Sequence, residues 1–262
     1  MFNDLPHPIL FAHRGACSYA PENTLAAFEL ALRQGADAIE LDAKLCADGH
    51  VVVIHDQTVE RTTDGQGNVR DLPLSSLRQL DAGSHFDVAF KGEGIPTLDE
   101  VFKAVGHMTI INVELTNYAS ISDALPDKVA ALVKRHKLSR RVIFSSFNII
   151  ALRRIHRVLP EVPLGFLALP GSKGWIVRSW IGKLLVPYQT LNPEFNDVTP
   201  SLIASQHQRG RGVLTYTVNK EEDLQRMFEL GVDGVFTDDP LLAIRVRQQI
   251  QQNTSQHKAH QP

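Results

Sequence analysis

Nine short runs rich in apolar and β-branched residues recur along the chain, and helical patterns separate most of them. The runs cover residues 9–13, 38–42, 51–55, 109–115, 142–146, 163–168, 188–192, 212–218 and 234–237. Because strands that alternate with helices are joined by right-handed crossovers, this order predicts a parallel sheet with helices packed around it. The length of 262 residues suits a single barrel of such units, which takes about 250 residues.

The third run departs from this alternation. Only the segment "AKLCADGH" separates it from the second run, whereas a crossover between parallel strands needs a dozen or more residues. The dipeptide Asp48–Gly49 instead indicates a hairpin with a two-residue turn, in which Asp42 faces His55. Since opposed residues and residues two apart share a face, Glu40, Asp42 and His55 are expected on the same side of one sheet.

Eight parallel strands remain once the hairpin arm is set aside, and they predict a TIM (β/α)8 barrel. We expect one domain over residues 1–250, with about 43–95 as an insertion after the second strand, and a polar, disordered tail over 251–262. Apolar residues at helical spacing predict helices over 24–34, 127–137, 148–158, 171–187, 200–208, 220–230 and 240–250.

The composition excludes several classes of function. The chain is 43% hydrophobic and 21% charged with a net charge of −2, so bulk charge gives no reason to expect nucleic-acid binding. No stretch reaches the ~20 apolar residues of a membrane span, and the N-terminus has no signal-peptide pattern. Two cysteines are too few for a disulfide framework. We therefore expect a cytoplasmic protein, whose oligomeric state the sequence leaves open.

Three acidic residues lie where a barrel of this kind places its chemistry, at the C-terminal ends of strands. Glu40 and Asp42 end the second run, and Glu114 comes late in the fourth. Carboxylates are costly to bury, and these would repel one another with no lysine expected alongside. A divalent cation resolves the repulsion, and ligation by oxygen alone suits Mg²⁺ or Ca²⁺ better than zinc.

Two histidines and an arginine complete the predicted constellation. His13 and Arg14 end the first run, and the hairpin brings His55 beside the carboxylates. Imidazole titrates near neutral pH and suits general acid and base catalysis, while the guanidinium fork suits a phosphoryl oxygen. Together with a metal, these groups indicate phosphodiester cleavage.

The motifs resemble those of the glycerophosphodiester phosphodiesterase family, in particular the short bacterial cytosolic enzymes. The resemblance spans about residues 9–240 and is carried by "AHRG…PENTLAAF", "GADAIELDAKLCADGHVVVIHD", "ERTTDGQGNV", "IPTLDEV", "VTPSLIASQHQRGRGVLTYTVN" and "GVDGVFTDDP". It implies a TIM barrel with an extra segment after the second strand. It also implies an enzyme of lipid and glycerol metabolism that hydrolyses glycerophosphodiesters to sn-glycerol 3-phosphate and an alcohol.

Residue by residue, the resemblance implies metal ligation by the three carboxylates and acid–base catalysis by the two histidines, with His13 as base and His55 as acid. In related phosphoinositide-specific phospholipases a substrate hydroxyl attacks phosphorus first, which implies attack by the glycerol 2-hydroxyl and a cyclic phosphate intermediate. The substrate site would include Arg14, Tyr216 where relatives carry tryptophan, and Thr116 where they carry lysine. A hydroxyl cannot supply the charge of that lysine, so either the substrate affinity or the rate is lower, or another cation compensates. Arg14 and the metal remain, which favours an active enzyme.

Two alternatives stay open. The segment 171–187 holds Trp175 and Trp180 among basic residues, a composition that suits a membrane interface and a lysophospholipase D acting on lysophospholipids. The absence of the usual lysine at position 116 favours instead a barrel that binds glycerophosphodiesters without turning them over.

Overall fold

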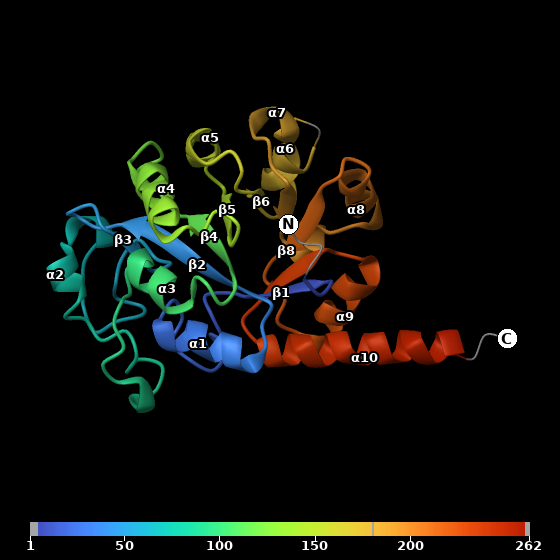
Figure 1. The fold of residues 1–262 in the computed structure, drawn as a ribbon, viewed down its shortest axis with the longest axis horizontal. Helices are drawn as coiled ribbons and strands as arrows, with labels where there is room; N and C mark the ends of the chain where they lie inside the picture. The colour runs from blue at the N-terminus through green and yellow to red at the C-terminus, as the bar shows by residue number, and fades with distance from the viewer. Residues whose placement is uncertain (1–4, 180, 260–262) are drawn as a thin grey trace.

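The protein forms a closed barrel of parallel strands, each followed by a segment that contains a helix (Figure 1). The computed structural model describes residues 5–179 and 181–259. The barrel strands are β1 (Ile9–Ala12), β2 (Ala38–Leu45), β4 (Ile110–Leu115), β5 (Val142–Ser146), β6 (Leu164–Ala168), β7 (Thr190–Pro193), β8 (Gly212–Thr215) and β9 (Gly234–Thr237). Strand β1 pairs in parallel with both β2 and β9, which closes the barrel and confirms the predicted fold.

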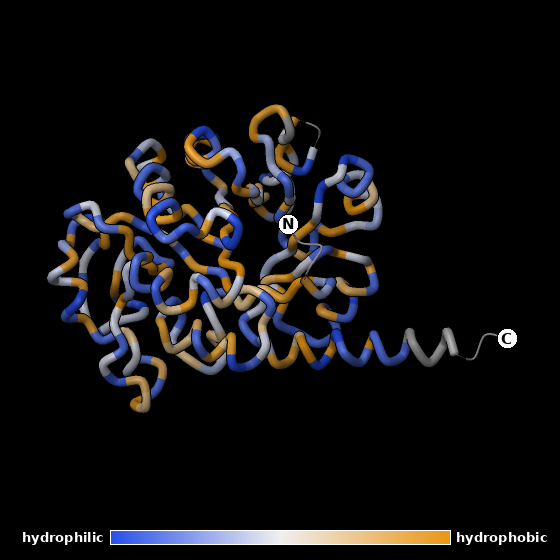
Figure 2. The backbone as a smooth tube through the Cα atoms, in the orientation of Figure 1, coloured by the Kyte–Doolittle hydropathy of each residue, from blue (hydrophilic) through white to orange (hydrophobic). Residues whose placement is uncertain are grey.

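The main helices surround the barrel, and hydrophobic and hydrophilic residues alternate along them (Figure 2). They are α1 (Leu25–Gln34), α3 (Leu98–Val105), α4 (Leu125–His136), α5 (Ile149–Val158), α8 (Pro200–His207), α9 (Glu221–Leu230) and α10 (Pro240–Ala259). Helix α1 shows how local sequence sets the ends: the Thr24 hydroxyl accepts from the Ala27 N–H at 3.2 Å, and Gly35 ends the helix at φ +89°. The predicted helices therefore form, except in the segment 171–187.

The barrel strands are buried on both faces, as parallel strands in this architecture are. Phe11 and Phe236 stack inside the barrel with their ring centroids 4.7 Å apart, in a cluster with Ile9, Ala38 and Leu214. The opposite faces pack against the helices in a larger core. The polar side chains at the C-terminal end are thus fixed by a rigid, filled barrel.

The hairpin after β2 forms, but its predicted register was wrong by one residue. Strand β3 (Val51–Val53) pairs antiparallel with β2, with Leu45 opposite Val51. The turn has three residues rather than two because Gly49 takes a left-handed conformation, φ +77°, and Cys46 N–H donates to His50 O at 3.1 Å. A slip of one residue reverses which face a side chain takes, so strand pairing does not bring His55 to its predicted position.

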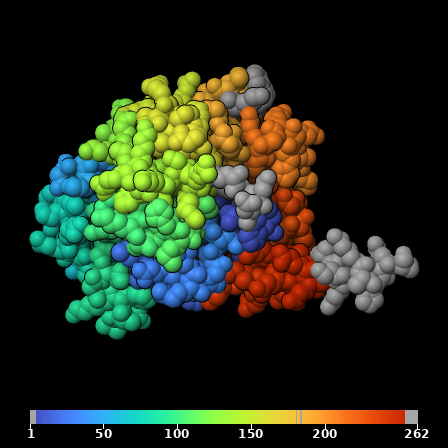
Figure 3. Space-filling model, in the orientation of Figure 1, coloured from blue at the N-terminus to red at the C-terminus, as the bar shows by residue number. Residues whose placement is uncertain are grey.

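The insertion after the second strand is confirmed, and it has a small core of its own. Between β3 and α3 lie helix α2 (Leu74–Leu77) and two short 3-10 helices, Val69–Asp71 and Val88–Phe90. Their buried apolar cluster includes Val59, Val69 and Leu77. Figure 3 shows this segment, in teal, at one side of the molecule next to the blue and green segments that carry α1 and α3.

Two chain segments differ from the sequence expectation. The single helix expected over 171–187 was wrong: a 3-10 turn (Gly171–Gly174), α6 (Trp175–Arg178) and α7 (Gly182–Leu185) replace it. Ser179 is extended and its hydroxyl bonds to Ile176 O and Ile181 N, which interrupts the helix. Trp180 lies outside the described residues. In the expected tail over 251–262, α10 continues to Ala259, and 260–262 lie outside the described residues. Among the described helices, none is long and apolar enough to cross a membrane.

The turn that follows β1 gives a first prediction. Gly15 has φ +86°, and a Cβ there would lie 2.7 Å from the backbone of Ala27. Gly15→Ala should lower the free energy of unfolding by about 3 kcal/mol, since backbone strain and a steric clash add. Gly231→Ala is the matched control, because φ is +81° there but the space is open, and its cost should be about 1 kcal/mol. Urea unfolding of both variants checks this, and equal costs would contradict it.

Candidate active site

Three carboxylates converge at the C-terminal end of the barrel, as predicted. Asp42 on β2 lies directly opposite Glu114 on β4, and Glu40 shares their face. Their ligand atoms lie within 4.8 Å of one another. Within the described part of the chain, the buried Oε1 of Glu40 has no hydrogen-bond partner. An unpartnered buried oxygen in an oxygen-only cluster fits a hard divalent cation such as Mg²⁺ or Ca²⁺.

The three carboxyl groups differ in the direction in which their surroundings shift their pKa. Burial, with the charges of Asp42 and Glu114, raises the pKa of Glu40 well above its usual value. Burial and Asp42 raise the pKa of Glu114 to about 8. Burial would also raise the pKa of Asp42, but Arg14, His55 and Asn23 outweigh it and hold that pKa below its usual value. The cluster therefore retains a proton near neutral pH in the absence of a cation.

The turn after β1 positions Arg14 against the carboxylates. Arg14 takes a left-handed conformation, φ +56°, and Gly15 follows in the same region, so the chain turns at once. The Arg14 N–H donates to Glu40 Oε2 at 2.9 Å, and its Nε lies 3.3 Å from Asp42 Oδ2. Its Nη1 donates to Glu22 Oε1 at 2.9 Å. One residue thus contacts two of the three carboxylates.

Asn23 also holds Asp42 in place, through the same Oδ2 that faces Arg14 Nε. It too is left-handed, with φ +58°, and its Nδ2 donates to Asp42 Oδ2 at 2.9 Å while its Oδ1 accepts from Asp42 N at 3.3 Å. Its neighbours Glu22 and Thr24 contact Arg14 and cap α1. The "PENT" motif therefore joins the start of a helix to the carboxylate cluster.

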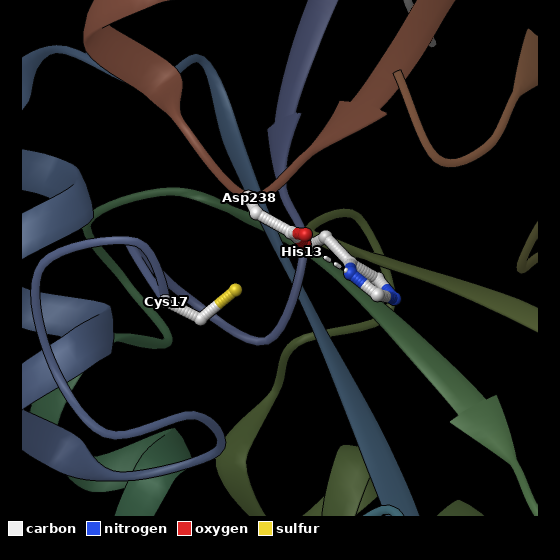
Figure 4. Close-up of side chains that lie close together, drawn as sticks. All are labelled: His13, Cys17 and Asp238. Atoms are coloured by element: carbon white, nitrogen blue, oxygen red, sulfur yellow. Dashed lines mark hydrogen bonds and ion pairs between the residues drawn. The ribbon is translucent and has the colours of Figure 1, made fainter. Parts of the chain in front are cut away.

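His13 is oriented by an acidic residue that sequence reasoning missed. Its Nδ1–H donates to Asp238 Oδ1 at 2.6 Å (Figure 4), and Asp238 accepts from Asn219 Nδ2 at 2.5 Å. This pairing leaves Nε2 available to act as a base. Cys17 lies on the other side of Asp238, where burial raises the pKa of its thiol and keeps it protonated. The two aspartates that follow β9 in the sequence "TDD" are the signal that could have indicated this partner.

His55 has an equivalent partner. Its Nδ1–H donates to Asp56 Oδ1 at 2.6 Å, and Arg61 Nε donates to Asp56 Oδ2 at 2.6 Å. Arg61 also donates to both oxygens of Glu22, at 2.7 and 2.8 Å. Since Glu22 accepts from Arg14, an unbroken chain of ion pairs joins His55 to the carboxylate cluster.

A small pocket opens over the carboxylates. Its wall combines acidic, polar and aromatic side chains and consists of His13, Glu40, Asn112, Glu114, Ser145, Phe147, Leu167, Tyr216 and Phe236. Asn112 Nδ2 donates to Ser145 Oγ at 2.7 Å, and its buried Oδ1 has no hydrogen-bond partner among the described residues. Tyr216 OH donates to Ala168 O at 2.7 Å, which fixes the ring. Two larger hollows lie elsewhere, and the carboxylate cluster lines neither.

Thr116 and its surroundings differ from the sequence expectation. Thr116 does not line the pocket; its hydroxyl donates to Ala43 O at 2.8 Å and accepts from Lys44 Nζ at 2.9 Å. Lys44 is only 4% exposed. The expectation that no lysine lies beside the carboxylates was wrong. Two-residue alternation along β2, which places Glu40 and Asp42 on one face, places Lys44 there too.

Comparison with known proteins agrees with this geometry. The glycerophosphoryl diester phosphodiesterase family model matches residues 13–242. The chain belongs to this family. A glycerophosphodiester phosphodiesterase of Caldanaerobacter subterraneus is 40% identical over 88% of this chain and 94% of its own length. A human lysophospholipase D is a more distant relative, 28% identical over 87% of this chain and 82% of its own.

A solved structure gives the same assignment. A phosphodiesterase of Oleispira antarctica in complex with the product sn-glycerol-3-phosphate has a TM-score of 0.84 and 31% identity, covering 94% of this chain and 98% of that one. The family predicted from the motifs is thus confirmed, and with it the enzyme class, a phosphodiesterase that hydrolyses glycerophosphodiesters.

The raised pKa of Glu114 predicts how stability of the metal-free phosphodiesterase depends on pH. The folded state keeps a proton up to about pH 8 that the unfolded chain loses near pH 4.5, so this contribution is present below pH 4.5 and is lost as the pH rises through 8. The melting temperature in chelator should therefore fall between about pH 5 and pH 8. Saturating Mg²⁺ or Ca²⁺ should oppose the fall.

Glu114→Gln isolates the responsible group. The variant should show a smaller fall in melting temperature over the same pH range, because the amide does not titrate. Glu161→Gln, an exposed site, serves as the matched control and should behave as the wild type does. An unchanged pH profile in Glu114→Gln would contradict the assignment.

Proposed function

We propose that the chain hydrolyses glycerophosphodiesters to sn-glycerol 3-phosphate and an alcohol in a reaction that depends on a divalent metal and on two histidines. The observation that carries the proposal is the buried carboxylate cluster with an unpartnered Glu40 oxygen, flanked by His13 and His55, each hydrogen-bonded to its own aspartate. The substrate is a small molecule, as the product bound to the Oleispira antarctica phosphodiesterase supports.

Glu40, Asp42 and Glu114 would hold the cation, and their oxygen-only donor set favours Mg²⁺ or Ca²⁺. When bound, the cation supplies positive charge that stabilises the phosphoryl oxygens as negative charge develops on them. Arg14 is the substrate-binding group beside it. Its guanidinium has five N–H donors, and among the described residues Glu22 and Asp42 occupy only some of them, so the others can bind a phosphoryl oxygen. Tyr216 contributes an aromatic wall, and Thr116 contributes to the substrate site indirectly, through Lys44.

The two histidines exchange protons in two steps. First, the glycerol 2-hydroxyl oxygen bonds to phosphorus as His13 Nε2 takes its proton, and the bond from phosphorus to the alcohol oxygen breaks as His55 protonates that oxygen. Water then opens the cyclic phosphate: His55 takes the proton of water, and His13 returns a proton to the 2-oxygen. The bonds to Asp238 and Asp56 support proton exchange by both histidines, since each aspartate stabilises the imidazolium of its histidine.

Lysophospholipid hydrolysis is the second candidate, and exposed apolar side chains favour it. Leu169, Trp175, Ile176 and Leu184 follow β6, whose Leu167 lines the pocket, and all four are exposed. Such a group beside an active site suits weak contact with a lipid surface or an acyl chain. Release of choline from lysophosphatidylcholine at a rate comparable to that from glycerophosphocholine would favour this reading, as would its loss in Trp175→Ser.

Release of glycerol 3-phosphate from glycerophosphocholine and glycerophosphoethanolamine tests the main proposal. We expect release with Mg²⁺ or Ca²⁺, none in chelator, and a loss of at least about 100-fold in kcat in His13→Ala. No release with either metal by a demonstrably folded protein, together with tight binding of glycerophosphocholine, would instead identify a binding barrel without turnover.

Asp238→Asn tests whether His13 works through its carboxylate. The amide can donate to Nδ1, which favours the wrong tautomer, so kcat should fall at least about 100-fold with little change in KM. Asp239→Asn is the matched control: this neighbour caps α10 by accepting from Leu242 N, a role that asparagine retains. Steady-state kinetics of both variants check the prediction, and equal effects would refute it.

A further inference from the structure

Lys44 is a buried cation beside the carboxylate cluster, and it neither transfers a proton nor ligates the cation in the proposed reaction. It follows Glu40 and Asp42 on the same face of β2 and is almost fully buried. Its Nζ donates to Thr116 Oγ1 at 2.9 Å and to Thr116 O at 3.2 Å. Burying an ammonium group is costly, so its place next to the carboxylates requires an explanation.

Thr116 fixes the direction of the ammonium group. Its hydroxyl hydrogen is committed to Ala43 O at 2.8 Å, so the lone pairs of Oγ1 face Lys44. A lysine has three N–H donors, and Thr116 takes two of them. The side chain is therefore held as a fixed positive charge rather than as a mobile surface lysine.

Charge balance shows what this cation does. Ionised Glu40, Asp42 and Glu114 carry three negative charges, and a divalent cation leaves one of them uncompensated. Arg14 does not restore the balance, because it belongs to the chain of ion pairs Arg14–Glu22–Arg61–Asp56, in which the positive and negative charges cancel. A phosphodiester carries a negative charge of its own, so a site with one charge uncompensated would repel its substrate.

We propose that Lys44 is the positioning cation that makes this site attractive to the phosphate group, in place of a lysine at position 116. The proposal rests on the proposed function. Lys44 acts through the charge of the carboxylate cluster: its positive charge weakens binding of the divalent cation and strengthens binding of the phosphate. The two ligands should therefore respond in opposite directions when the charge is removed, which a role in folding alone would not produce.

Calorimetric titration of Lys44→Met tests this. We expect Ca²⁺ and Mg²⁺ to bind about 10-fold more tightly, and sn-glycerol 3-phosphate to bind about 10-fold more weakly at saturating Ca²⁺. Lys103→Met is the matched control, since this exposed lysine pairs with Asp99 on α3 and should leave both affinities unchanged. Weakening of both ligands, or a change in neither, would overturn the proposal.

Two further variants keep the test decisive. Lys44→Gln retains a donor to Thr116 without the charge, and it should reproduce the opposite shifts if Lys44→Met does not fold. Thr116→Lys in the Lys44→Met background returns a cation to the adjacent position and should restore phosphate binding to within about 3-fold of the wild type. Failure of this rescue while the variant stays folded counts against the proposal.

The result of these titrations can be distinguished from a failure of the proposed function. These titrations use the metal and the product, and they require no turnover. If the wild type releases no glycerol 3-phosphate but the opposite shifts appear, the hydrolytic mechanism fails and the assignment of Lys44 stands. If hydrolysis occurs and the shifts are absent, the reverse holds.

Discussion

Repulsion among three buried carboxylates is the constraint on which the rest of the site depends. Their ligand atoms lie within 4.8 Å of one another at the end of a filled barrel, where burial limits screening by water. The surrounding groups each relieve part of this repulsion. The Arg14 backbone N–H donates to Glu40, and the Tyr118 hydroxyl donates to Glu114. The Asn23 amide and the Arg14 guanidinium contact Asp42. Because one Glu40 oxygen stays unpartnered, the protein alone leaves the cluster incomplete.

Strand β2 is the element that organises this cluster. It pairs with β1, β4 and β3, so the side chains on its inner face lie next to residues at the ends of these strands. Alternate residues on that face are two acids and then a lysine, which gives the site a charge gradient along a single strand. Their position is rigid because the strand is buried on both faces, and a site on rigid elements holds its geometry more closely than one on loops.

The fold and the carboxylate cluster were predictable from the sequence because both follow from periodicity. Strand and helix runs fix the barrel, and the two-residue alternation on β2 brings Glu40 and Asp42 together. The hairpin register was not predictable, because a left-handed Gly49 adds a residue to the turn. The pairing of Asp238 and Asp56 with the two histidines was not predictable for a related reason: each aspartate follows a strand, and its contact with a histidine depends on loop conformation. Lys44 was predictable by the same alternation and was overlooked.

The chain of ion pairs from Asp56 to Arg14 makes the insertion part of the active site rather than an addition to it. Asp56 and Arg61 belong to the insertion, whereas Glu22 and Arg14 belong to the loop after β1. Exposed ion pairs contribute little to stability individually, but here each charge is shared between two partners, so displacing one disturbs the next. The position of His55 is thus set by contacts across the barrel mouth rather than by strand pairing. This explains how His55 comes close enough to influence Asp42 although the hairpin register does not direct it there.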